Sequence, residues 1–174
     1  MFFEQQLVIN WSVLAVLVIV AFWVHRKLAG HQDRFKFFGH KSEAMFDLWS
    51  VQHFLSGIIV VWLIFQKGPW TGFIDKFGWL LAVCFIAYLW EFIEIFMEAG
   101  YFGKTIAIWK DGFEHWSNRF ISDPLTAVLG GIVYIEFTWI IWPALVLNIL
   151  WFILNVRRKH SMEIQEKFIQ LFQR

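Results

Sequence analysis

The sequence predicts an all-α protein, a polytopic bundle of membrane-spanning helices that forms one domain from residue 1 to residue 174. Composition is the first reason, because 59% of the residues are hydrophobic and 17% are charged. Soluble domains are usually about 45–50% apolar and about 25% charged. The 12 tryptophans are the second reason, because amphipathic rings are favoured where a protein meets the two lipid–water interfaces.

Four apolar regions are predicted as spans, at residues 7–26, 47–66, 77–98 and 124–155. A bilayer core of about 30 Å needs roughly 20 mostly apolar residues in a helix. The fourth region would extend about 48 Å as one helix, which is too long for one straight crossing, and Pro143 offers a kink or a break. We therefore predict four spans and leave a fifth open. Residues 160–174 are predicted as a short amphipathic helix suited to a membrane surface or a partner.

Lysine and arginine set the expected orientation, because cytoplasmic loops carry an excess of them. Several basic residues follow the first span, between Arg26 and Lys41, which favours an N-terminus outside. With four spans, the basic segment Arg157–Lys159 would then lie outside, against the rule. A fifth crossing would remove this conflict.

Three glutamates form a polar stripe at the end of the third span. Glu91, Glu94 and Glu98 are spaced so that they lie on one face of a helix. Ionisable residues within a membrane usually face the bundle interior or a cavity. Three carboxylates this close predict bound protons or bound cations. Glu98 has an alternative interpretation, since a residue at the end of a span can reach the interface.

Two other segments offer partners for these glutamates. In the second span, Asp47 and His53 lie near the start, and Gly57 permits a close approach of another helix. His53 is alternatively an interfacial histidine. The small pairs Thr126/Gly130 and Ala127/Gly131 predict that a helix packs tightly against the start of the fourth region.

The link before the fourth region carries a second polar face. Four of its residues repeat at helical spacing: Asp111, Glu114, His115 and Asn118. A solvated loop face is the alternative interpretation. Asp123 directly precedes Pro124, a pattern typical of a helix N-cap. Farther on, Glu136 and Asn148 are single polar residues, which we predict to form hydrogen bonds between helices.

Histidine and carboxylates together suit a divalent metal such as zinc, iron or manganese. The candidate metal ligands are His53, Glu91, Glu94, His115 and Asp123. The candidate catalytic residues are His53, Glu91 and Glu94, and further candidates for the site are Asp47, Glu98, Asp111 and Glu114. The sequence holds no His-Glu-x-x-His motif, and a net charge of +1 without a basic stripe gives no sign of a nucleic-acid partner.

The order of the short motifs resembles that of the VanZ-like membrane proteins, and most closely their YjdF-like branch. The motifs are Asp47 with HFLSG, then WEFIE, then DPLTAVLGG, and the resemblance covers about residues 44–135. The resemblance implies that the site residues are Asp47, His53, Glu91, Glu94 and Asp123. The chain departs from the pattern by its added Glu98 and by its tryptophan-rich final region. The resemblance implies a protein of the bacterial inner membrane that is linked to the cell envelope.

Two functional hypotheses follow. In the first, the His/Glu/Asp site acts on a membrane lipid or on a lipid-linked envelope precursor with a divalent metal or a proton. In the second, the chain is a non-catalytic subunit that is held in a larger complex by a membrane protein partner or by other copies of itself. A transporter is a third possibility, and it would require oligomerisation.

Overall fold

The computed structural model describes residues 2–67, 78–102, 112–156, 167 and 170, and it is mostly helical. The main helices are α1 (Phe2–Ala29), α2 (Trp49–Lys67), α3 (Gly78–Glu98), α4 (Asp123–Glu136) and α5 (Ile141–Val156). A π-helical turn, η2 (Asn118–Ser122), leads directly into α4, and a 3₁₀ turn, η3 (Thr138–Ile140), precedes α5. The predicted amphipathic helix at 160–174 falls almost entirely outside the described residues.

The connection from α1 to α2 contains the one departure from an all-α fold within the described residues. Strands β1 (Lys36–Phe38) and β2 (Ala44–Phe46) form a small parallel pair. The Lys36 amide donates to the Glu43 carbonyl, and the Gly39 amide donates to the Phe46 carbonyl. Aromatic residues favour this pleated pairing, and the Phe37 and Phe46 rings lie 5.2 Å apart.

The predicted number of spans is borne out only in part. Two helices, Val8–Ala29 and Gly78–Glu98, are long and apolar enough to cross a membrane, and Trp49–Phe65 is a shorter apolar helix. Residues 118–136 and 138–153 together count as at most one more span, and the chain bends by 120° between the two parts. The described residues therefore contain two or three candidate spans, and four or five crossings remain a prediction.

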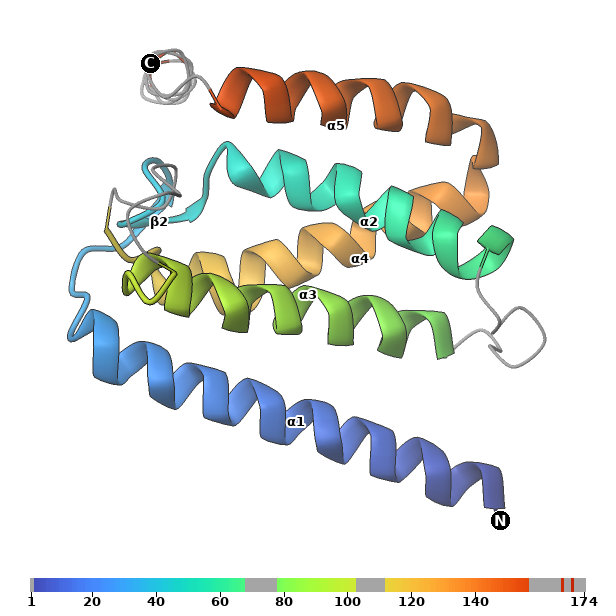
Figure 1. Cartoon of the computed structure of the whole chain (residues 1–174), viewed down its shortest axis with the longest axis horizontal. Coiled ribbons are helices and arrows are strands. Elements are labelled where there is room, and N and C mark those ends of the chain that lie inside the picture. The colour runs from blue at the N-terminus through green and yellow to red at the C-terminus, as the bar shows by residue number, and fades with distance from the viewer. Residues whose placement is uncertain (1, 68–77, 103–111, 157–166, 168–169, 171–174) are drawn as a thin grey trace.

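The fourth apolar region breaks at Phe137, not at Pro143 as we expected. Phe137 leaves the helical conformation, with φ −132° and ψ 74°, and α5 then starts at Ile141. Pro143 therefore lies in the first turn of α5, where its missing N–H and fixed φ are tolerated. The break turns α5 back along α2, so the region forms a helical hairpin (Figure 1).

Glycine brings α2 and α4 into close contact, as the small-residue spacing predicts. A Cβ added at Gly57 would overlap the backbone of Ala127, and one added at Gly130 would overlap the carbonyl of Phe54. Only glycine at both positions allows the two backbones to approach this closely. The predicted hydrogen bond of Asn148 is also confirmed, because its Nδ2 donates to Ser56 Oγ at 3.3 Å. The prediction for Glu136 is wrong, since this residue is exposed at the end of α4.

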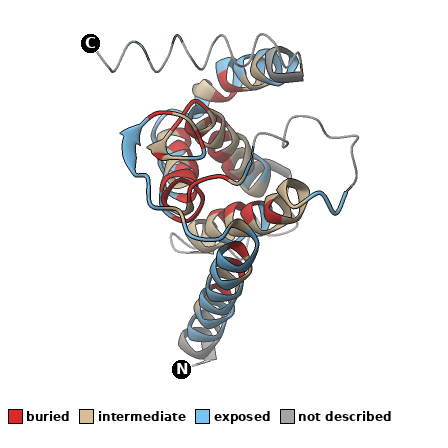
Figure 2. Cartoon of the chain, turned by 90° about the vertical axis from the view of Figure 1, so that its left-hand side faces the viewer, coloured by how far each residue is buried: buried red, intermediate tan, exposed pale blue. Residues whose placement is uncertain are grey.

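Helix α1 packs on the bundle through a single stripe. Leu14, Ala21 and His25 are buried, and their spacing of seven and four residues places them on one face. From Val8 onward the rest of α1 is largely exposed and apolar, and Figure 2 shows the helix projecting from the buried centre. Such a surface is expected of a helix that faces lipid.

Candidate polar site at one end of the bundle

One end of the bundle gathers most of the buried polar side chains. Helices α1, α3 and α5 end there, and α2 and α4 begin there (Figure 1). We call it the site end. It brings together six carboxyl groups and two permanent cations, all in the described residues and all buried or partly buried. These residues are Asp47, Glu91, Glu94, Glu98, Glu114, Asp123, Lys41 and Arg119.

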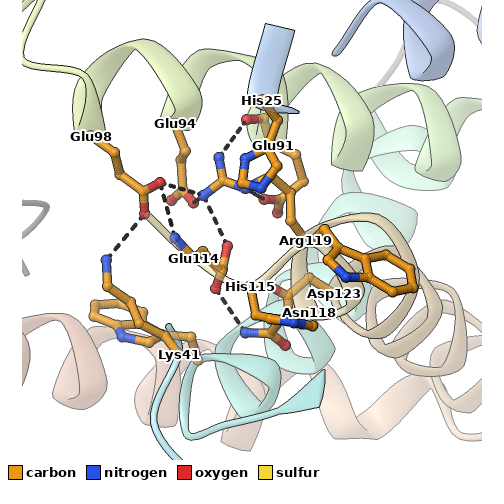
Figure 3. Close-up of polar contacts among 12 residues, drawn as sticks. His25, Lys41, Glu91, Glu94, Glu98, Glu114, His115, Asn118, Arg119 and Asp123 are labelled. Carbon is orange, nitrogen blue, oxygen red and sulfur yellow. Dashed lines mark hydrogen bonds and ion pairs between the residues drawn. The ribbon is translucent and has the colours of Figure 1, made fainter. Parts of the chain in front are cut away.

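Arg119 lies at the centre of the carboxylates and is fully buried. Its Nη2 donates to Glu98 Oε2 at 2.9 Å and to Glu114 Oε2 at 3.0 Å. Its Nε lies 3.8 Å from Glu91 Oε2, and its Nη2 lies 4.0 Å from Glu94 Oε2. One guanidinium therefore links the predicted glutamate stripe of α3 to η2 (Figure 3).

Lys41 adds the second cation from the connection between α1 and α2. Its Nζ donates to Glu98 Oε1 at 3.1 Å, and the Glu98 side chain is 0% exposed. The interfacial interpretation of Glu98 is therefore wrong, because two buried cations hold this carboxylate inside the protein. Burial opposes the charge of Lys41, but the carboxylates of Glu98 and Glu114 outweigh it, so the pKa of Lys41 is raised.

The π-helical turn explains how Asp123 enters the site. Because η2 continues into α4, Asp123 has helical φ and ψ and its side chain is not a cap. The N-cap interpretation is therefore wrong. Pro124 has no N–H to donate to the Phe120 carbonyl four residues earlier, and the Tyr88 hydroxyl donates to that carbonyl at 3.0 Å instead. π-Helical turns occur frequently at functional sites.

Asp47 begins α2 and borders the site. Its Oδ1 accepts from the amides of Trp49 and Ser50, at 2.8 and 3.1 Å, which caps the helix. Burial, and then the nearby Glu114, raise the pKa of Asp47 to about 7. The hydroxyl of Ser50 lies 3.1 Å from Ser122 Oγ and donates to Asp123 Oδ1 at 3.2 Å. The start of α2 is thus joined to the start of α4 by hydrogen bonds.

His53, Glu91 and Asp123 form the first of two groups with suitable donors for a metal ion. His53 Nε2 lies 3.6 Å from Glu91 Oε1 and 3.4 Å from Asp123 Oδ2, and the three donor atoms all lie within 4.8 Å of one another. Two ligands of a tetrahedral ion with bonds of about 2.1 Å are about 3.4 Å apart. Neither Glu91 oxygen, nor Asp123 Oδ2, has a hydrogen-bond partner among the described residues. The arrangement therefore fits a small divalent cation.

Glu91, Glu94 and Glu114 form the second group. Here Arg119 already supplies a positive charge, since it donates to Glu114 and lies near both other members. A metal ion in this group would be repelled by the guanidinium. We therefore favour the first group as the cation site.

Two sequence-predicted candidates lie apart from both groups. His115 is buried, but its Nδ1 pairs with Ser117 Oγ at 2.7 Å, and it belongs to neither donor group. Asp111 lies outside the described residues. Glu114 is buried and not part of a solvated loop face. Burial raises the pKa of Glu114 even though Arg119 lies close to it.

Sequence reasoning missed the cations of the site. It used Lys41 only as an indicator of orientation and gave Arg119 no role in the site, although both are buried. The available signal was charge balance, since three neighbouring glutamates on an apolar helix require positive partners. Gln32 was also missed. Its side chain joins the end of α1 to the site, because Nε2 donates to the Glu114 carbonyl and Oε1 accepts from the Trp116 amide, both at 3.0 Å.

A cavity of about 340 Å³ opens beside the first donor group. It lies between α2 and α3, and Ala127 of α4 also lines it. His53 and Glu94 lie at its polar end, and most of its remaining wall is apolar. His53 thus belongs both to the cavity and to the first donor group.

The charges of the site constrain its chemistry. Six carboxyl groups face two permanent cations, and burial makes an excess of negative charge costly. Protons or a bound cation must compensate part of this excess. The arrangement can therefore hold a divalent ion, transfer protons, or do both.

Comparison with known proteins finds no matching family model, no matching curated protein and no matching solved structure. The resemblance to VanZ-like proteins therefore stays a prediction carried by short motifs.

Proposed function

We propose that this chain is an integral membrane protein that binds a divalent cation between His53, Glu91 and Asp123, and that it acts there on a lipid or a lipid-linked substrate of the cell envelope. One observation carries the proposal: His53 Nε2 lies 3.6 Å from Glu91 Oε1 and 3.4 Å from Asp123 Oδ2, all three donors lie within 4.8 Å of one another, and neither Glu91 oxygen has a hydrogen-bond partner among the described residues. Buried carboxylate oxygens are normally paired or bound to metal.

The cavity supports the choice of substrate. Its apolar wall suits a hydrocarbon chain, and its polar end presents His53 and Glu94 to the head of such a molecule. A divalent cation supplies Lewis-acid chemistry when bound. Glu94 would hold or move a proton at the head group, and Arg119 Nη2 lies 4.0 Å from its Oε2.

Metal content per chain tests the proposal. The protein, purified in mild detergent, is expected to retain a near-stoichiometric divalent metal in elemental mass spectrometry. Glu91→Gln and Asp123→Asn each remove a charged donor with little change in shape, so both should lose the metal. Glu136→Gln is the matched control, because Glu136 is an exposed acid on the same helix as Asp123, and it should retain the metal.

Absence of metal from the unaltered protein would overturn the cation proposal. The accessory-subunit hypothesis would then be favoured. It is supported by α1, which packs on the bundle through one stripe and leaves an apolar face exposed. In that case Glu91→Gln should dissociate a stable complex that co-purifies with the unaltered chain.

A further inference from the structure

We propose, building on the membrane function above, that the cavity between α2 and α3 holds a single hydrocarbon chain of a lipid, drawn from the leaflet at the site end. The head of that lipid would lie against His53, Gln52 and Glu94. This inference adds a defined substrate class to the proposed cation site.

The length of the cavity matches one leaflet. Along α2 its lining runs from Trp49 to Val60, and along α3 from Glu94 to Val83. At 1.5 Å per helical residue, each of these stretches covers about 16 Å. Half of a hydrocarbon core of about 30 Å is about 15 Å. A chain that enters at the head-group level therefore reaches the bilayer midplane.

The width of the cavity accommodates an extended chain. A volume of about 340 Å³ spread over this length gives a mean cross-section of about 21 Å². That area is enough for one extended hydrocarbon chain. The deep part is lined by Val60, Val83 and Ala87, which offer no polar partner to a ligand.

The mouth of the cavity opens on the apolar surface of the bundle. Ile86, Trp90 and Phe152 line the cavity and are themselves 43%, 39% and 58% exposed. A lipid chain can therefore enter sideways from the bilayer, without passing through water. The narrow α2–α4 contact at Gly57 closes the opposite side.

The polar end selects the type of head group. Its lining offers an imidazole, an amide, a hydroxyl and a carboxylate, from His53, Gln52, Ser56 and Glu94. In the part of the chain that the structure describes, the lining contains no lysine and no arginine. The cavity alone therefore favours a hydroxyl-bearing head, and a phosphate would need the divalent cation beside it.

Photo-crosslinking with dodecanol tests this inference, because its chain is about as long as one leaflet. One probe carries a diazirine next to the hydroxyl, and the other carries it near the chain terminus. The first is expected to label Gln52 and Trp90, and the second to label Val60, Val83 and Ala87. Labelling spread evenly over Leu63, Leu89 and other exposed apolar residues would overturn the inference.

Two variants should block the cavity. Ala87→Phe fills its deep part, and Ile86→Trp narrows its mouth, so each should lower labelling of the cavity residues severalfold. Leu89→Trp is the matched control, because Leu89 is also an exposed apolar residue of α3 but does not line the cavity. If Ala87→Phe fails to fold, Ile86→Trp alone decides, and unchanged labelling in it contradicts the inference.

Glu91→Gln separates this inference from the cation proposal. If the Glu91→Gln protein loses its metal but its cavity residues are still labelled, the cavity binds a hydrocarbon chain without needing the cation. A protein that retains its metal but shows no depth-dependent labelling would refute the lipid chain and leave the cation site standing.

Discussion

Arg119 is the residue on which the polar site depends. A buried guanidinium is costly unless carboxylates surround it, and Glu98 and Glu114 lie within 3.0 Å of it. The buried carboxylates of Glu98 and Glu114 likewise depend on Arg119, because few other cations lie near them within the described residues. Lys41 reaches Glu98 but makes no ion pair with Glu114.

We predict that Arg119→Gln strongly destabilises the protein. Removing one partner of a buried ion pair leaves uncompensated charge and typically costs about 3–5 kcal/mol. The thermal midpoint in detergent should fall markedly. It is measured as the temperature at which half of the protein no longer remains monodisperse after heating. Arg26→Gln is the control, since Arg26 is exposed at the end of α1, and it should change the free energy of unfolding by less than about 0.5 kcal/mol. Equal effects of both changes would contradict the central role of Arg119.

At this scale the sequence identified the acids of the site but not its geometry. The glutamates of α3 follow from helical spacing, because period and composition are local properties. Asp123 was misinterpreted because its neighbour Pro124 is a local signal for a cap, whereas the preceding π-helical turn depends on contacts with α3. Arg119 lies beside Glu98 only in the folded chain, and no local pattern reveals a pairing between separate elements.

Helices α2 and α4 form the closest helix contact of the bundle, and two glycines permit it. Because the Cβ positions of Gly57 and Gly130 would overlap backbone atoms of the facing helix, no side-chain rotation can relieve the clash. This contact also fixes His53 relative to Asp123, since both lie at its polar end.

We predict that Gly57→Ala separates the two helices and lowers stability by about 1–3 kcal/mol or more, as overpacking does. A shift of α2 would also move His53 away from Asp123, so metal retention should fall together with the thermal midpoint. Gly39→Ala serves as the control, because its added Cβ would meet Ala44 Cβ at an ordinary 3.4 Å. A Gly57→Ala protein of unaltered stability would show that the contact is looser than described here.

The elements themselves were largely predictable, because long apolar runs bounded by polar residues are the strongest sequence signal for a membrane helix. The site of the break in the fourth region was not. Pro143 is compatible with a helix start as well as with a kink, and the conformation of Phe137 is set by how α5 folds back against α2. The small β1–β2 pair was likewise hidden, since its strands are only three residues long.

At the scale of the whole molecule, the α4–α5 hairpin changes the expected topology. Helix α5 ends at the site end, where α1 also ends (Figure 1). The sequence places Arg26 and Lys27 at the end of α1, and Arg157 and Arg158 directly after α5. Both basic segments then start from the same side of the bundle, which agrees with the positive-inside rule.

We predict that the site end faces the cytoplasm. In a Cys84→Ser background, Arg34→Cys would place a thiol at the site end, and Thr71→Cys would place one in the link from α2 to α3. A membrane-impermeant maleimide added to intact cells should label the second position and not the first, and inverted vesicles should give the opposite result. Labelling of both positions from the same side would contradict the predicted crossing of α2.

The pairing of Glu98 with Arg119 has a consequence for how the chain is made. Arg119 lies 21 residues after Glu98, so at about 5–20 residues per second the ribosome adds it roughly 1 to 4 seconds later. Lys41 has been synthesised by then, and it can neutralise Glu98 at once. We expect Glu91 and Glu94 to stay protonated or in water until the guanidinium is available. On this basis we expect insertion of α3 to be coupled to translation of the segment that follows it.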